Sequence, residues 1–316
     1  FGTEYLVGDG AETRRASASS RLQDLAGATP SVGDWVAVQR RESVDLIRAV
    51  VARRTVFSRK AAAAESREQV LAANVDVAFV VAAATDVNQR RIERYLTIAW
   101  QSGASPVVLL TKADVADATE PLRDSLAAVS IGTPVAVTSS VTGEGLDEIG
   151  RMLRPSLTGV LLGPSGAGKS SLNNRLLGHT VMQTREVHRS GEGRHVTSHR
   201  HLFQLPGGGM IIDTPGLREA QLWEGAGALA DVFGDVESLA RECRFHDCPH
   251  DAEPGCAVKA ALETGALDFG RLRSYRKLQR ELQAVAMRSD ARLRADERRK
   301  WKRISMANRS RERYLR

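Results

Sequence analysis

Short hydrophobic runs alternate with helix-spaced hydrophobic residues through the middle of the chain. The runs lie at 79–81, 107–110, 135–137, 160–162 and 210–212. After the first run, Ile92, Tyr95, Leu96 and Ala99 have the spacing of one helix face. Buried strands that alternate with helices are typical of a parallel sheet covered by helices on both sides. The pattern therefore predicts a central α/β domain.

The two ends of the chain have different patterns. Alternating apolar segments at 32–38 and 46–51 predict short strands, whereas the small, polar residues at 11–28 specify strands only weakly. After Gly216 the spacing becomes helical, and the last helix carries an apolar stripe of Leu272, Tyr275, Leu278, Leu282 and Val285. We predict a β domain at 1–60, an α/β domain at 61–220 and a helical domain at 221–316.

Composition and charge narrow the class of protein. With 316 residues, 42% hydrophobic and 26% charged, the chain has the composition of a folded globular protein, which excludes wholesale disorder. No apolar run approaches the roughly 18 residues that a membrane span needs, and the first residues do not have a signal-peptide pattern. We expect a cytoplasmic protein that does not enter a membrane.

The net charge of +7 is unevenly distributed. Residues 271–316 hold 17 Lys and Arg against 5 Asp and Glu, while the rest of the chain has 28 against 33. A basic tail on an acidic body favours a polyanionic partner such as nucleic acid. The alternative is a solvated helix face with no partner.

Residues 163–170 match the phosphate-loop pattern G-x-x-x-x-G-K-[ST]. A strand at 160–162 and a helix reaching residue 177 are expected on either side, so backbone N–H groups and a helix N-terminus would converge on a phosphate; the alternative is an ordinary Gly-rich turn. Lys169 is expected to reach the β- and γ-phosphates and Ser170 to bind Mg²⁺. The predicted phosphate-binding residues are Gly163, Pro164, Ser165, Gly166, Ala167, Gly168, Lys169, Ser170, Ser171 and Gly216.

Two further motifs follow predicted strands. Asp213-Thr-Pro-Gly216 reads as a switch, with Asp213 as a Mg²⁺ ligand. Thr111-Lys-Ala-Asp114 ends in a carboxylate that can accept hydrogen bonds from guanine N1–H and N2–H₂, and adenine has neither donor there, which disfavours a general ATPase. The predicted guanine-binding residues are Thr111, Lys112, Asp114, Ser139 and Ser140, with Lys112 lying along the ring and the serines following the next strand.

Three cysteines lie close together near the C-terminal end. Cys243, Cys248 and Cys256 with His250 supply three thiolates and one imidazole within 14 residues, which suits tetrahedral structural zinc. An odd number of cysteines does not form a disulfide framework. His246 is a competing imidazole, and three buried free thiols are the alternative.

The motifs occur in a permuted order, because the guanine motif precedes the phosphate loop. In this order the chain resembles the bacterial circularly permuted GTPases, and within them the branch that depends on the small ribosomal subunit. The resemblance covers 32–282 and rests on the three nucleotide motifs, Val32-Gly-Asp-Trp-Val36, Gln69-Val-Leu-Ala-Ala-Asn-Val-Asp76, Gly193-Arg-His-Val-Thr197, Asp213-Thr-Pro-Gly-Leu-Arg-Glu219 and the cysteine cluster.

The resemblance implies an N-terminal OB-fold, a P-loop GTPase domain and a helical zinc domain in which His250 is the fourth ligand. It also implies a role in late maturation of the small (30S) ribosomal subunit. The family usually has Asn at the position of Thr111, and His-Thr-Thr where this chain has His195-Val196-Thr197.

Together these features predict a Mg²⁺-dependent GTPase that binds GTP, GDP and rRNA, works as a monomer and is stimulated by the small subunit. Leu217 follows the switch glycine and cannot orient water, so His195 is the expected catalytic residue. Ser170, Thr197 and Asp213 are the expected Mg²⁺ ligands. The alternative is an rRNA-binding assembly factor that uses nucleotide as a latch, with negligible turnover.

Overall fold

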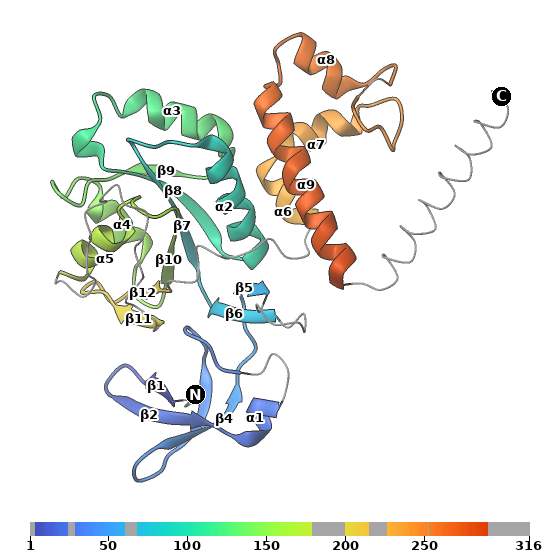
Figure 1. Cartoon of the computed structure of the whole chain (residues 1–316). Helices are drawn as coiled ribbons and strands as arrows, with labels where there is room; N and C mark the ends of the chain where they lie inside the picture. Colours follow the sequence, from blue (N-terminus) through green and yellow to red (C-terminus); the bar gives the residue numbers. More distant parts are fainter. Residues whose placement is uncertain are drawn as a thin grey trace, which may run out of the picture. The chain divides into compact units, whose positions relative to one another are not determined.

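The computed structural model describes residues 4–24, 29–60, 68–178, 200–214, 226–251 and 253–289. The chain divides into two compact units, Phe1–Gln221 and Leu222–Arg316 (Figure 1). The predicted boundary near residue 60, between a β domain and an α/β domain, stays a prediction. Within the described residues, no helix is long and apolar enough to cross a membrane.

A six-stranded sheet forms the centre of the first unit, in the order β11-β12-β10-β7-β8-β9. Each predicted apolar run lies in one of its strands. The strands are β7 (Val77–Ala83), β8 (Ser105–Thr111), β9 (Val135–Val137), β10 (Thr158–Leu162), β11 (His201–Gln204) and β12 (Met210–Asp213). All neighbouring pairs are parallel except β11 with β12.

Strand β11 departs from the predicted all-parallel sheet. It joins β12 through a tight turn in which Leu205 N–H donates to Gly209 O at 2.7 Å, and Gly208 N–H donates to Leu205 O at 2.9 Å. Side chains alternate along β11 between half-buried and exposed, as expected for an antiparallel edge strand with one solvated face. The hairpin therefore adds a mixed edge to an otherwise parallel sheet.

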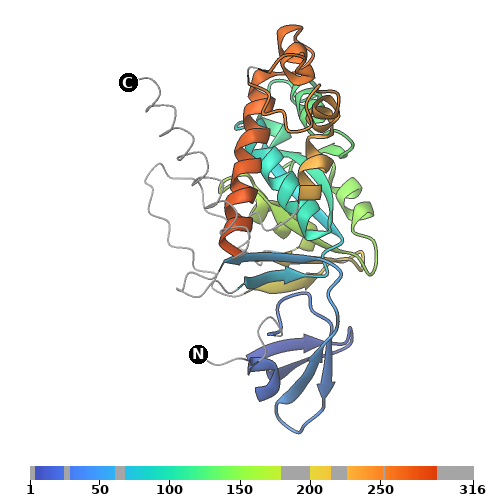
Figure 2. The same ribbon diagram turned by 90° about the vertical axis from the view of Figure 1, so that its right-hand side faces the viewer.

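Helices cover both faces of this sheet (Figures 1 and 2). They are α2 (Gln89–Ser102), α3 (Glu120–Val129), α4 (Leu146–Met152) and α5 (Lys169–Leu177), with a short 3₁₀ helix at Ala113–Val115. The predicted helix containing Ile92 and Leu96 is α2. It begins where the Asn88 side chain accepts from Arg91 N–H, and it ends at Gly103, whose φ of 87° suits glycine.

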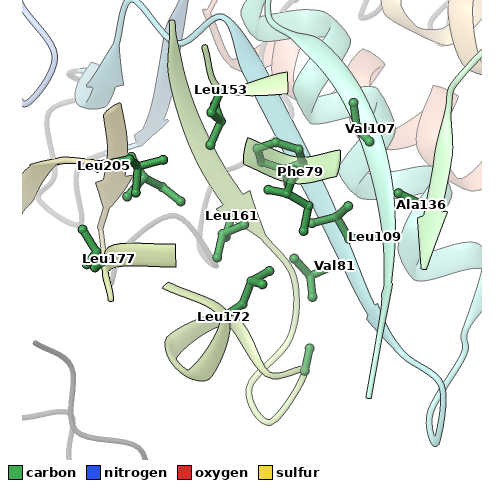
Figure 3. Packing of buried hydrophobic residues seen from close by; sticks show 13 residues of the cluster. Phe79, Val81, Val107, Leu109, Ala136, Leu153, Leu161, Leu172, Leu177 and Leu205 are labelled. Atoms are coloured by element: carbon green, nitrogen blue, oxygen red, sulfur yellow. The ribbon is translucent and has the colours of Figure 1, made fainter. Parts of the chain in front are cut away.

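One hydrophobic core lies between the sheet and helices α4 and α5 (Figure 3). Phe79 and Val81 of β7 contribute to it, and residues 78, 80 and 82 face the opposite side because strand side chains alternate. On that opposite side, α2 packs against β7 and β8, and its residues Ile92 and Leu96 are buried. The sheet is thus buried on both faces, which explains its nearly continuous apolar strands.

The N-terminal residues form a smaller four-stranded sheet in the order β1-β2-β4-β3. Its elements are β1 (Glu4–Gly8), β2 (Thr13–Ala18), β3 (Val36–Gln39), β4 (Asp45–Val50) and the short helix α1 (Ser20–Asp24). An OB-fold has five strands. In the described part of the N-terminal region, residues 4–24 and 29–60, four strands pair with one another in this sheet. Strands β5 (Val56–Lys60) and β6 (Glu68–Ala73) form a separate antiparallel ribbon.

The second unit is helical where it is described, with α6 (Ala226–Val232), α7 (Gly234–Arg241), α8 (Ala257–Glu263) and α9 (Phe269–Ser289). The stripe predicted on α9 is buried at Leu272, Tyr275, Leu278 and Leu282. Arg271 is also buried, and its guanidinium contacts Asp235 at 2.6 Å, Val232 O at 2.7 Å and the Phe233 ring. This contact joins α9 to the end of α6 and the start of α7.

Candidate nucleotide and metal sites

The predicted phosphate and guanine motifs lie at the same edge of the central sheet. Strands β10 and β8 both pair in parallel with β7, and β9 pairs in parallel with β8. The carboxyl ends of these strands therefore lie at the same edge of the sheet. The phosphate loop follows β10, Thr111 ends β8, and Thr138 follows β9. In open α/β sheets, ligands bind outside the carboxyl ends of the strands.

The phosphate loop has the backbone geometry of an anion site. A β-carbon at Gly163 would lie 2.6 Å from Val81 O, so only glycine permits this close approach. Gly168 has a φ of 88° and precedes the first residue of α5, which directs the N-terminus of that helix toward the loop. Ser165 and Gly166 are exposed, and Ser170 and Ser171 lie in the first turn of α5.

Lys169 folds back over its own loop. Its Nζ donates to Gly163 O at 2.8 Å and to Pro164 O at 2.5 Å. In this position the Lys169 ammonium can replace its hydrogen bonds to the two carbonyl oxygens with hydrogen bonds to phosphate oxygens. The side chain is thus held at the mouth of the predicted phosphate site.

Asp114 and Ser139 form a pair in the guanine motif. The buried Ser139 hydroxyl donates to Asp114 Oδ1 at 2.5 Å and accepts from the N–H groups of Val141 and Thr142, both at 3.1 Å. Asp114 is exposed, so its carboxylate is oriented by Ser139 and open to a ligand. The Ser139 hydroxyl thus orients Asp114, a contact for which the sequence contained no signal.

Thr111 connects the guanine motif to the phosphate loop. Its side chain is buried, and Oγ1 lies 2.7 Å from Ala167 O and 3.2 Å from Ala82 O. Ala167 belongs to the phosphate loop, 56 residues further along the chain. The hydroxyl therefore points into the protein, toward the phosphate loop, and the predicted role of Thr111 in guanine binding stays a prediction.

Asp213 ends β12, next to the strand that leads into the phosphate loop. Val160 of β10 pairs with Ile212, so residues 213 and 214 run beside the last residues before Gly163. The Thr214 hydroxyl is buried and has no hydrogen-bond partner within the described part of the chain. A buried hydroxyl without a partner is costly unless a ligand or water satisfies it, which fits a hydrated Mg²⁺ or phosphate here.

Three predicted site residues, His195, Thr197 and Gly216, lie outside the described residues. Their predicted roles stay predictions, as does the assignment of Leu217 as a non-catalytic position. The predicted ligands Ser170 and Asp213 are described, and both lie at the edge of the sheet that carries the phosphate loop.

The cysteine cluster has the geometry of a zinc site. The ligand atoms of Cys243, Cys248, His250 and Cys256 lie within 4.8 Å of one another. Cys243 Sγ is 3.5 Å from His250 Nδ1 and 3.9 Å from Cys256 Sγ. Zn–S bonds of about 2.3 Å place tetrahedral ligands about 3.8 Å apart. The cluster fits one structural zinc, and His250, not His246, belongs to it.

The surroundings shift the pKa values of three of these ligands, and for His250 and Cys243 the shift favours the metal-binding form. Burial lowers the pKa of His250, and the nearby Arg276 lowers it further, which favours the neutral imidazole that binds metal. Burial raises the pKa of Cys243, but backbone N–H groups of Val258 and Ala257 together with neighbouring thiols outweigh it, and the net shift is downward. Burial raises the pKa of Cys248 to about 11.

Arg276 of α9 also holds the loop that carries the histidine ligand. Its Nη2 donates to Pro249 O at 3.1 Å, to His250 O at 3.0 Å and to Asp251 Oδ1 at 2.9 Å. This support lies 26 residues from His250. The sequence motif contained no signal for it, because the contact depends on how α9 packs.

Comparisons with known proteins agree with this arrangement. The family model of the RsgA GTPase matches residues 50–223. The chain is 52% identical to the small ribosomal subunit biogenesis GTPase RsgA of Streptomyces avermitilis, over 86% of this chain and 74% of that protein. It is 45% identical to the small ribosomal subunit biogenesis GTPase RsgA 1 of Oceanobacillus iheyensis, over 88% of this chain and 80% of that protein.

Solved structures give the same result. YjeQ from Thermotoga maritima has a TM-score of 0.63 and 25% identity, with 88% of this chain and 94% of that chain covered. YloQ, described as a circularly permuted GTPase, has the same fold, with a TM-score of 0.61, 24% identity and 90% and 92% of the two chains covered. From the family model and the identity to curated relatives, the chain belongs to the RsgA GTPase family.

Proposed function

We propose that this protein is a Mg²⁺-dependent GTPase that acts in late maturation of the small ribosomal subunit and hydrolyses GTP faster when bound to it. The observation that carries the nucleotide part is the pair of contacts Thr111–Ala167 and Ser139–Asp114. These contacts orient the Asp114 carboxylate and tie the end of β8 to the loop at 163–170, which supports the proposal that guanine and phosphates bind at this edge of the sheet. The names of the curated relatives support the ribosomal part.

The chain's own residues bind and orient the nucleotide in this proposal. Asp114 accepts from guanine N1–H and N2–H₂, and Lys112 and Ser140 border the base. The N–H groups of residues 163 and 165–171 and of Gly216 surround the phosphates, with Pro164 shaping the loop and Lys169 turned from its loop carbonyls to the phosphate oxygens. Residues Ser170, Thr197 and Asp213 would hold Mg²⁺, which neutralises charge that develops during phosphoryl transfer.

His195 is the proposed catalytic residue. A neutral imidazole can hold the attacking water in line or accept its proton. Because the small subunit is proposed to bring this residue into position, hydrolysis is slow for the free protein and faster in the complex.

The proposed partner is the rRNA of the small subunit. The excess of Lys and Arg in residues 271–316 supports it, because such a segment gains binding energy from phosphates by releasing counterions. We also propose that the protein acts in the cytoplasm as a monomer, where a single copy meets one subunit.

A nucleotide-latched assembly factor with negligible turnover is the competing function. GTP hydrolysis measured with purified small subunits, with large subunits and with neither separates the two. The proposal expects stimulation by small subunits alone, whereas a latch gives the same low rate in all three reactions.

The variant His195→Ala tests the catalytic assignment in the same assay. It is expected to keep nucleotide binding and subunit association but to lose roughly 10²-fold or more of the stimulated rate. Full stimulated turnover, at matched occupancy of GTP and subunit, would exclude this histidine.

A further inference from the structure

The loop at residues 31–34 of the N-terminal β sheet contacts two elements next to the proposed nucleotide site. A β-carbon at Gly33 would lie 2.1 Å from Ala73 O and 3.0 Å from Ile212 Cδ1. Ile212 directly precedes Asp213, a proposed Mg²⁺ ligand. The loop therefore packs against the strand whose last residue belongs to that site.

Arg200 joins the same loop to the neighbouring strand. Its Nη1 donates to Val70 O at 2.8 Å and lies 3.4 Å from Ser31 Oγ, which itself donates to Val70 O at 3.2 Å. Burial lowers the pKa of Arg200, and the nearby Arg59 lowers it further. Burial and the like charge of Arg59 both disfavour the charged guanidinium at this place. The hydrogen bonds to Val70 O and Ser31 Oγ offset that cost and hold the side chain.

The register of the hairpin places this contact close to the nucleotide site. Arg200 directly precedes β11, and the first residue of β11, His201, is the pairing partner of Asp213. The guanidinium thus fixes the Asp213 end of the β11–β12 hairpin to β6 and to the N-terminal loop.

The loop itself is rigidly held. Ser31 N–H donates to Asp34 Oδ2 at 2.7 Å, and the Arg53 guanidinium donates to both carboxylate oxygens of Asp34 at 2.8 Å. The Asp34 side chain is almost fully buried in this ion pair. Because bidentate pairs fix orientation, a shift of Arg200 moves the loop as a unit.

We propose that Arg200 couples the nucleotide site to the N-terminal β sheet. A change at Asp213 between the GTP and GDP states shifts the start of β11, and Arg200 transmits that shift to Ser31 and β6. The two nucleotides then give the N-terminal sheet different affinities for a partner that binds it. By linkage, that partner changes the relative affinities for the two nucleotides by the same factor. The inference rests on the proposed function, since it takes the nucleotide as the ligand.

Amide hydrogen exchange of the full chain tests this coupling. Exchange in peptides spanning residues 29–39 is measured with saturating GDP and with a non-hydrolysable GTP analogue. The two states are expected to differ in exchange rate by about fivefold or more in the unmodified protein. In Arg200→Ala the difference should disappear, while the affinity for a fluorescent guanine nucleotide changes by less than about fivefold, the lower end of typical coupling.

Two further variants complete the experiment. Arg123→Ala removes an exposed arginine that pairs with Glu120 on α3, and it should keep the full difference. Ser31→Ala removes only the hydroxyl at the N-terminal side of the contact and should reduce the difference. It also tests the coupling if Arg200→Ala does not fold, as judged by thermal unfolding.

The outcomes separate the coupling from the proposed function. If no guanine nucleotide binds, the proposed function fails, and the coupling fails with it. If nucleotide binds but residues 29–39 exchange equally in both states, or if Arg200→Ala and Ser31→Ala keep the difference, only the coupling is overturned.

Discussion

The contact between Thr111 and the phosphate loop allows a quantitative prediction for Thr111→Val. Valine has nearly the shape of threonine but has no hydroxyl, so the change removes the 2.7 Å hydrogen bond to Ala167 O without opening a large cavity. Both residues are buried, with Thr111 4% and Ala167 2% exposed. The carbonyl of Ala167 thereby loses its donor inside the protein.

An unsatisfied buried polar group costs about 1–3 kcal/mol. In the nucleotide complex the loop must keep its shape, so the full cost applies there. In the free protein the loop can shift until water reaches the carbonyl, and part of the cost is then avoided. The loss in unfolding free energy of the free protein and the loss in nucleotide-binding free energy should therefore sum to about 1–3 kcal/mol.

Two measurements on each variant check this sum. Urea unfolding without nucleotide gives the loss in unfolding free energy. Titration with a fluorescent GDP gives the loss in binding free energy. If the whole cost falls on binding, the Kd rises by at most about 150-fold. Thr111→Ser is the matched control, because it keeps the hydroxyl and should bind GDP like the unmodified protein. Unchanged unfolding and unchanged Kd in Thr111→Val would refute the reasoning.

Three further predictions follow from the sites and the N-terminal sheet. Asp114→Asn should weaken GTP binding by about 2–4 kcal/mol, because a charge-assisted bidentate contact is lost, and it should favour xanthosine triphosphate. A competition titration measures both effects, and a GTP affinity equal to that of the unmodified protein would contradict the guanine assignment. Elemental analysis should find one zinc per chain. In Cys248→Ser and His250→Ala both the zinc content and the helical circular dichroism of the second unit should fall. Folded, zinc-free protein purified without chelator would exclude the site. The Arg14 guanidinium and the Arg41 N–H lower the pKa of Asp45, so its stabilising effect should be complete above about pH 4 and lost as the pH falls further. Urea midpoints of the unmodified protein and Asp45→Asn should therefore differ at pH 7 and converge in acid, and a gap that persists in acid would contradict the carboxylate's role.

The sequence by itself determined the features whose signals are local. The apolar runs of β7, β8, β9, β10 and β12 are visible because a strand buried on both faces consists of consecutive hydrophobic residues. The phosphate loop is also readable, since its glycines and lysine act through their immediate neighbours. The cysteine spacing indicated a zinc site for the same reason, although the residues alone left His246 and His250 as alternatives.

Only the tertiary structure decided the features that depend on distant pairing. Strand β2 has small, polar residues, and it forms because β1 and β4 supply its hydrogen bonds on either side. The antiparallel edge strand β11 depends on its turn into β12. Strand propensity is weak compared with such context.

The same reason applies to the side chains that organise the sites. The Thr111 hydroxyl contacts a carbonyl 56 residues away, and Arg200 contacts one 130 residues away. In sequence, each is a single polar residue at the end or beginning of a strand, a position that is usually solvated. Their partners are fixed by the strand order and register of the whole sheet, which no local pattern encodes.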